Sequence, residues 1–172
     1  TVFKTSQQPC NTSAGEWCFD GERLQCTTCQ AGTYYVAQCT AASDRLCTSC
    51  AAGKFSASSN SASCTFCPAG FHQDADGAVA CRPCNNSALK YCKEASTVAA
   101  EVSAGYYTAP EGHGARRTEQ HLCRVDVEWC AGGVRQNCGM CVRGESAASP
   151  CTVTTDRSCV KCAPGKFTVA NN

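Results

Sequence analysis

The sequence predicts a small disulfide-rich fold, an elongated series of tandem cysteine-rich modules with short β-strands and little helix. Nineteen of the 172 residues are cysteine, about 11%, a range typical of extracellular disulfide scaffolds. Five of them follow the spacing C-x2-C-x9-C-x7-C-x2-C at residues 26–50 (block 1) and again at residues 138–162 (block 2). Aromatic residues make up only 8% of the chain, so no large apolar core is expected.

Cross-links must therefore supply the stability that burial does not. A disulfide that closes a ~15-residue loop contributes roughly 3 kcal/mol in the chain-entropy model. The net charge of +1 gives no argument for nucleic acid or an anionic membrane. No apolar run approaches the ~20 residues that span a bilayer, so no membrane insertion by this segment is expected. Without a signal segment, we expect a mature extracellular protein, secreted or at the cell surface, or a piece of one.

The cysteine spacing divides the chain into five segments. These are an N-terminal short loop (1–25), block 1 (26–50), a ladder of C-x2-C pairs with a short loop (51–92), a cysteine-free insertion (93–122), and a second, truncated copy of the short loop and block (123–172). Three block 1 residues return in block 2 together with the cysteines: Thr40, Asp44 and Arg45 become Thr152, Asp156 and Arg157. The segments TYYVAQCT and KFTVA carry β-branched and aromatic residues and are predicted to be short strands.

The insertion 93–122 contains thirty residues without a cysteine. Its start, KEASTVAAEV, has the composition of two or three helical turns, although Thr and Val weaken that prediction. Tyr106, Tyr107, Arg116 and Arg117 are the best candidates for partner contacts, because Tyr and Arg are favoured at interfaces. The alternative is a solvated loop without a contact role.

Two sequons support an extracellular location. Asn11 and Asn85 each begin an N-x-S motif directly after a cysteine, and both are expected to carry N-linked glycans. The alternative is that both are unmodified turn asparagines. No other cofactor is expected.

Other chemistry fits the sequence less well. The C-x2-C pairs are typical of zinc sites, but Cys10, Cys18, Cys39, Cys92 and Cys151 have no role in such a scheme. A redox-active C-x2-C needs a thiolate at a helix N-terminus, which nothing here predicts. His72, His113 and His121 have no nearby Ser-Gly elbow, and the D-x-D-G pattern of Asp74 and Asp76 lacks the later ligands of an EF-hand. We therefore predict no metal site, no catalytic residue and no enzymatic activity.

The block CTTCQAGTYYVAQCTAASDRLCTSC resembles a cysteine-rich module of the tumour necrosis factor receptor family. The shared features are two C-x2-C pairs, a Gly-x-Tyr segment, Cys-Thr, and Asp-Arg before the next Cys. The ladder CAAGKFSASSNSASCTFCPAGFHQDADGAVACRPC resembles repeats of ephrin receptors and of many protist surface proteins. These resemblances cover roughly residues 18–92 and 130–167, and the insertion has no counterpart in a standard module.

The resemblance implies a disulfide pairing that spacing alone leaves open. The implied pairs are Cys10–Cys18, Cys26–Cys39, Cys29–Cys47, Cys50–Cys64, Cys67–Cys81, Cys84–Cys92, Cys123–Cys130, Cys138–Cys151 and Cys141–Cys159. Cys162 is left over. It is the repeat equivalent of Cys50, so we expect its partner either in a continuation of the chain or in an adjacent subunit.

Two functions fit these features. The first is a structural glycoprotein whose copies associate with one another into an extracellular filament, coat or appendage. The second is the ligand-binding ectodomain of a receptor similar to the tumour necrosis factor receptors. In both, the partners are other protein chains.

Overall fold

The computed structural model describes residues 7–85, 87–112 and 116–168. Within these residues the structure contains one short 3-10 helix and a series of short strands. The elements are η1 (Thr12–Ala14), β1 (Glu16–Phe19), β2 (Glu22–Gln25), β3 (Thr33–Ala37), β4 (Leu46–Ser49), β5 (Lys54–Phe55), β6 (Thr65–Phe66), β7 (Phe71–His72), β8 (Arg82–Pro83), β9 (Lys90–Tyr91), β10 (Ala100–Glu101), β11 (Tyr106–Ala109), β12 (Glu119–Leu122), β13 (Glu128–Ala131), β14 (Val134–Asn137), β15 (Glu145–Ser149) and β16 (Ser158–Lys161).

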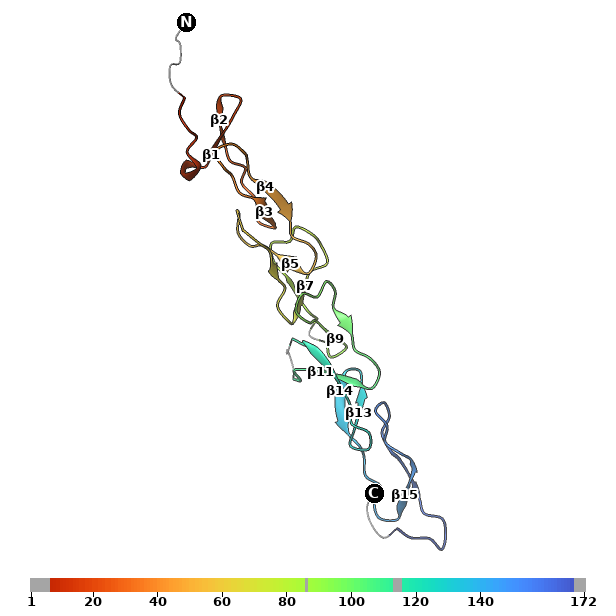
Figure 1. Ribbon diagram of the computed structural model, residues 1–172. Helices are drawn as coiled ribbons and strands as arrows, with labels where there is room; N and C mark the ends of the chain where they lie inside the picture. The colour runs from red at the N-terminus through yellow and green to blue at the C-terminus, as the bar shows by residue number, and fades with distance from the viewer. Residues whose placement is uncertain (1–6, 86, 113–115, 169–172) are drawn as a thin grey trace. The chain divides into compact units, whose positions relative to one another are not determined.

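The strands pair in twos as antiparallel hairpins between neighbours in the chain (Figure 1). The small disulfide-rich fold of tandem cysteine-rich modules is confirmed, with nine disulfides that have the pairing implied by the resemblance. Among the described residues, no helix has the length and apolar character needed to cross a bilayer. Contacts divide the chain into two compact units.

Unit 1 comprises residues 1–67 and 73–82. It contains the hairpins β1–β2, β3–β4 and β5–β6. Block 1 supplies β3 and β4, which are closed by two interleaved disulfides, Cys26–Cys39 and Cys29–Cys47.

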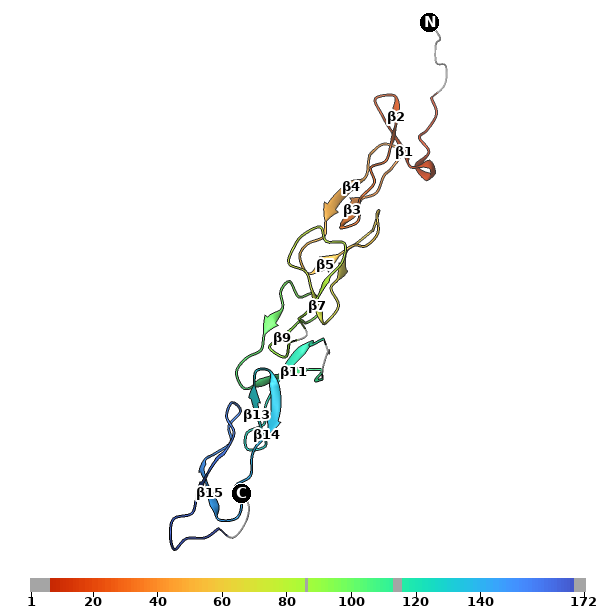
Figure 2. The ribbon, with the colours of Figure 1, turned by 180° about the vertical axis from the view of Figure 1, so that it is seen from behind.

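Unit 2 comprises residues 68–72 and 83–172. It contains the hairpins β9–β10, β11–β12, β13–β14 and β15–β16. The residues of the insertion form β10, β11 and β12, and β11 lies beside β14 in both views (Figures 1 and 2). The insertion is therefore an integral part of unit 2.

The core consists of half-cystines. All buried hydrophobic side chains in the described part of the chain are cysteines, and they are Cys10, Cys29, Cys50, Cys67, Cys84, Cys92, Cys123, Cys130, Cys141 and Cys151. Larger apolar side chains such as Met140 and Phe66 are half or more exposed. Covalent cross-links thus occupy the place that aliphatic packing has in larger domains.

One backbone hydrogen bond recurs from module to module. The N–H of a cysteine donates to the carbonyl oxygen of an upstream glycine at 2.8–2.9 Å in the pairs Cys50–Gly32, Cys67–Gly53, Cys84–Gly70, Cys123–Gly105 and Cys162–Gly144. At Gly105 the φ angle is +81°, a left-handed conformation that favours glycine. The cysteine-free insertion thus contains the same turn as the cross-linked modules.

The predicted helix at the start of the insertion is wrong. Residues 93–99 form turns, and β10 pairs with β9 through Ala100 opposite Tyr91. Ala95 has a φ of +60°, which cannot continue a right-handed helix. The strand predicted at KFTVA is also not formed in its described part, residues 166–168, whereas TYYVA forms β3.

Candidate functional site

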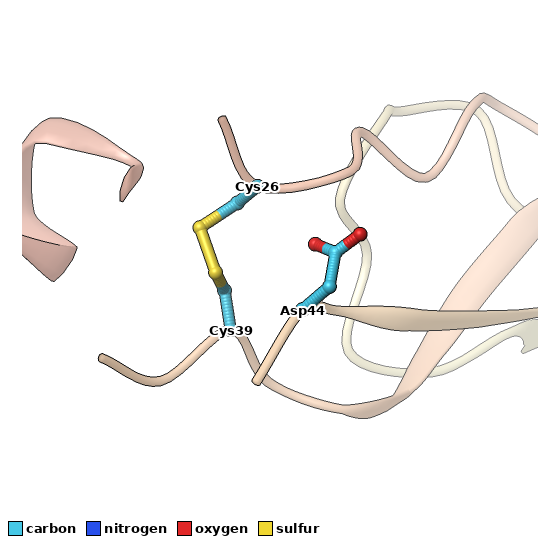
Figure 3. A group of neighbouring side chains, drawn as sticks. All are labelled: Cys26, Cys39 and Asp44. Atoms are coloured by element: carbon cyan, nitrogen blue, oxygen red, sulfur yellow. A yellow bond between two sulfur atoms is a disulfide. The ribbon is translucent and has the colours of Figure 1, made fainter. Parts of the chain in front are cut away.

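In unit 1 the carboxylate of Asp44, near the end of block 1, is hydrogen-bonded to the start of the block. Asp44 lies beside the Cys26–Cys39 disulfide (Figure 3). Its carboxylate accepts hydrogen bonds from the hydroxyl of Thr27 at 2.5 Å, the backbone N–H of Thr27 at 2.7 Å and the N–H of Arg45 at 2.6 Å. These hydrogen bonds hold the pKa of Asp44 below its ordinary value, and the bond from the Thr27 hydroxyl has the largest effect.

In unit 2 Asp156 has the same role in block 2, beside the Cys138–Cys151 disulfide. It accepts from the N–H groups of Gly139 and Arg157, each at 2.7 Å. Gly139 replaces Thr27, so the hydroxyl donor is lost. The aspartate that recurs with the cysteines therefore accepts backbone N–H groups in both blocks.

The sulfur and carboxylate atoms of Cys26, Cys39 and Asp44 all lie within 4.8 Å of one another, as do those of Cys138, Cys151 and Asp156. Both sulfur pairs are joined as disulfides and offer no thiolate, the form in which cysteine binds zinc. The carboxylates are occupied by backbone N–H donors. Both clusters therefore stabilise the fold through a disulfide and hydrogen bonds.

Of the four predicted contact residues, Arg117 is placed differently from the expectation. Its side chain is buried, with 7% of the residue exposed. The guanidinium donates to the carbonyl oxygens of Thr108 at 3.0 Å, Gly112 at 3.1 Å and Pro110. Because its guanidinium is hydrogen-bonded to β11 and to the loop that follows it, Arg117 is not available to a partner.

Tyr107 is half-buried and also has intramolecular neighbours. Its ring lies 5.5 Å from that of His121 on the opposite strand, and the guanidinium of Arg135 lies 4.8 Å from its centre. Arg135 also pairs with Glu111 of the insertion at 2.9 Å. Arg135 thus joins the insertion to the β13–β14 hairpin.

Arg135 also contacts Glu128, whose side chain is 6% exposed. Arg124 pairs with Glu128 at 2.9 Å and holds the pKa of that carboxyl below its ordinary value. Sequence reasoning missed Glu128 and Arg135. Their signal was present, because Glu16 and Arg23 form the equivalent pair at 3.5 Å in unit 1 and recur 112 residues later.

Arg116 and Tyr106 remain as contact candidates. Arg116 is exposed, and its guanidinium lies 4.6 Å from the centre of the Phe71 ring. Its Cβ would lie 2.9 Å from a Cβ built on Gly70, so it packs closely on that turn. Tyr106 is half-buried at the start of β11.

Both sequon asparagines are exposed and adopt the same local geometry. The side-chain oxygens of Asn11 and Asn85 each accept the N–H of the serine two residues on, at 3.1 Å. This leaves the side-chain nitrogen, the atom to which N-linked glycans attach in modified sequons, free to face solvent. Asn86, the middle residue of the second sequon, lies outside the described residues.

Among the described residues, His72, His121, Asp74 and Asp76 have separate neighbours and form no common cluster. His121 contacts Glu119 at 3.2 Å, and His72 lies 4.0 Å from Cys92 Sγ; His113 lies outside the described residues. Asp74 pairs with Arg82 at 3.2 Å, and Asp76 accepts the N–H of Ala52 at 2.8 Å.

A cavity of about 340 Å³ in unit 1 has lining that is small or polar. Its residues are Tyr34, Thr48, Ser49, Ala51, Lys54, Ser63 and Cys64. Lys54 is its single charged side chain and stacks at 4.5 Å on Phe66. The lining thus offers no acid and base pair for catalysis.

Comparison with known families agrees with this architecture. Residues 15–47 match the TNFR/NGFR cysteine-rich region, and residues 53–99 match the family described as tyrosine-protein kinase ephrin type A/B receptor-like. No curated protein matches the chain. Modules of these kinds occur in the extracellular parts of receptors, where their partners are proteins. The chain is thus built from cysteine-rich repeats like those of tumour necrosis factor and ephrin receptors.

Proposed function

We propose that this chain is a non-enzymatic, secreted or cell-surface glycoprotein whose copies associate into an extracellular filament, coat or appendage. The observation that supports this most directly is a contrast between the two copies of the short loop and block. Their disulfide pattern and strand pairing are equivalent, whereas their exposed apolar side chains are different.

The first copy exposes Phe19, Leu24, Val36 and Leu46 (set A), each 37–63% accessible. The residues 112 positions later are Ala131, Gln136, Ala148 and Ser158. Among the exposed apolar side chains of the second copy are Val134, Met140, Val142 and Val160 (set B), each 46–73% accessible. Their counterparts in the first copy are Glu22, Thr28, Gln30 and Thr48.

The two copies of the scaffold therefore expose apolar side chains at different positions, set A in unit 1 and set B in unit 2. A repeating contact that extends into a fibre is heterologous, and it needs two different complementary surfaces on each subunit. A closed dimer needs only one self-complementary surface. Exposed apolar side chains beside short edge strands are suited to such contacts.

The proposal is tested with one charged substitution in each set, Leu46→Asp and Val142→Asp, and with Val98→Asp as a control outside both sets. Sedimentation and electron microscopy would then be compared for each chain. We expect each variant alone to be monomeric, their equimolar mixture to stop at dimers, and the control to assemble like the native chain. A native chain that stays monomeric at high concentration would contradict self-assembly.

A ligand-binding ectodomain is the second candidate, favoured by the match of residues 15–47 to the TNFR/NGFR cysteine-rich region. In that case set A or set B contacts a different protein. A monodisperse native chain, bound by a cell-surface or secreted protein and losing that binding with Leu46→Asp or Val142→Asp, would support this candidate.

A further inference from the structure

The insertion has the register of block 1 at a constant offset of 73 residues. This offset places the five cysteines of block 1 onto Ala99, Val102, Gly112, Gln120 and Cys123. Around the turn, the sequence AGTYY of block 1 corresponds to AGYYT of the insertion. Only the last of the five cysteine positions keeps its cysteine.

The turn hydrogen bonds agree with this alignment. The N–H of Thr33 donates to Gln30 at 3.1 Å, and the N–H of Tyr106 donates to Ser103 at the same distance. The later bond to the glycine carbonyl is 2.9 Å long for both Cys50 and Cys123.

The strand pairing agrees as well. Tyr35 pairs with Cys47 in block 1, Ala147 pairs with Cys159 in block 2, and Thr108 pairs with Gln120 in the insertion. Gln120 thus occupies the half-cystine position of the second strand. Val102 precedes Gly105 by three residues, as Cys29 precedes Gly32.

The contact with the following module is also the same in block 1 and in the insertion. The N–H of Tyr35 donates to Ser61 at 3.0 Å, and the N–H of Thr108 donates to Gly133 at 3.0 Å. The neighbouring residues form parallel bridges, Tyr34 with Ser61 and Tyr107 with Gly133. Residues 102–112 and 116–123 are therefore a module of the same repeat without its internal disulfides.

Side-chain hydrogen bonds connect the segments of the insertion module, which lacks the internal disulfides of block 1. The side chain of Gln120 accepts the N–H of Ser103 at 2.8 Å and donates to its hydroxyl at 3.2 Å. Arg117, at the position of Asp44, binds three carbonyl oxygens of the hairpin and its loop. These hydrogen bonds stabilise the folded module. Unlike a disulfide, they do not restrict the conformations of its unfolded state.

We propose that this module is a noncovalent opening point in an otherwise stapled chain, able to unfold and refold locally without reduction of any disulfide. A cross-link across an 18-residue separation lowers the population of the open state on the order of a hundredfold through chain entropy. The modules of Cys29–Cys47 and Cys141–Cys159 have such a cross-link, and the Val102–Gln120 module does not. This inference is independent of the proposed assembly.

Amide hydrogen exchange of the native chain, under non-reducing conditions, tests the proposal. The protection factors of the Thr108 and Cys123 amides are compared with those of their equivalents, Tyr35 and Cys50. We expect protection at least about tenfold lower in the insertion module. Equal protection at both pairs would overturn the proposal.

Two reciprocal variants make the test independent of local sequence. Val102→Cys with Gln120→Cys is expected to form a tenth disulfide, detected by peptide mapping, and to raise protection at Thr108 at least tenfold. Cys141→Val with Cys159→Gln is expected to lower protection at Cys162, whose N–H binds Gly144. A Val102→Cys, Gln120→Cys chain that keeps both thiols alkylatable would contradict the alignment.

Discussion

The carbonyl oxygen of Ala88 lies where a Cβ on Gly133 would have to be. The separation would be 1.8 Å, and the Ala88 carbonyl carbon would be 2.6 Å away. The same carbonyl oxygen accepts the hydroxyl of Thr108 at 2.8 Å, and Thr108 is fully buried. Three segments of unit 2 therefore meet at a backbone contact that leaves no room for a side chain.

We expect Gly133→Ala to destabilise unit 2 more than Gly132→Ala. Both glycines have positive φ angles, +74° and +58°, so both substitutions carry a left-handed strain of about 1–2 kcal/mol. A Cβ on Gly132 meets only a Leu89 methyl group at 3.8 Å, whereas a Cβ on Gly133 must displace backbone.

Denaturant unfolding of the oxidised variants measures the difference, and amide protection of Thr108 locates it. Gly132→Ala is the matched control for the strain of the left-handed conformation. Equal midpoints for the two variants would show that the Gly133 contact with Ala88 is not close in solution.

The contact at Gly133 also shows what the sequence cannot predict. Half-cystine spacing and the family resemblance are enough for the disulfide pairs, because each pair lies within 18 residues and its spacing recurs. The burial of Arg117 and Thr108 depends on carbonyl groups that only folding brings together. Arg117 therefore has the sequence properties of a surface residue, and its true neighbours are visible only in the structure.

The insertion was misread for a related reason. A repeat that is recognised by its cysteines cannot be recognised when they are replaced by Val102 and Gln120. The remaining signal, AGTYY against AGYYT, is short, and the Ala-rich segment before it favours a helical interpretation. The positive φ of Ala95 and the pairing of β10 with β9 exclude the helix.

Acid is expected to destabilise unit 2 through Glu128. Arg124 lowers the pKa of its carboxyl in the folded state, so the unfolded state binds more protons as the pH falls toward the ordinary glutamate value of about 4.3. The contribution is fully present above that value and is lost as the pH falls through the lower folded pKa. Asp44 acts with the same sign in unit 1.

Glu128→Gln should therefore be less stable than the native chain near neutral pH and should lose less stability between about pH 6 and about pH 3. Denaturation midpoints across that range measure both effects. Glu94 is exposed, so Glu94→Gln serves as the control for replacing a glutamate at the surface. A Glu128→Gln chain with the native slope would exclude this carboxyl as a source of acid sensitivity.

Cys162 is the one cysteine of the described chain without a disulfide partner, and it is half-exposed. A chain of residues 1–172 is expected to bind one equivalent of alkylating reagent when native and nineteen after reduction. Cys162→Ser should bind none when native. Three native equivalents would show that one of the nine pairs is open.

The same measurement tests the expectation that an adjacent subunit supplies a partner thiol. A disulfide-linked dimer that disappears in Cys162→Ser would place the partner on a second copy of the chain. Monomer with one alkylated thiol would remove that expectation for residues 1–172.

Asn11 and Asn85 are expected to carry N-linked glycans when the chain is made in a eukaryotic secretory pathway. Their side-chain oxygens bind serine N–H groups at 3.1 Å in the same manner, so both present the amide nitrogen alike. Asn11→Gln and Asn85→Gln should each remove one glycan mass from the intact protein.

Asn60 provides the internal control for this modification. It is not in a sequon, and its side-chain oxygen accepts the N–H of Cys29 at 2.9 Å within unit 1. Glycosidase treatment should therefore leave Asn60 unchanged while lowering the mass of the native chain by two glycans. A native mass equal to that of the bare polypeptide would show both sequons to be unmodified turns, because their exposure offers no steric reason for the transferase to pass them by.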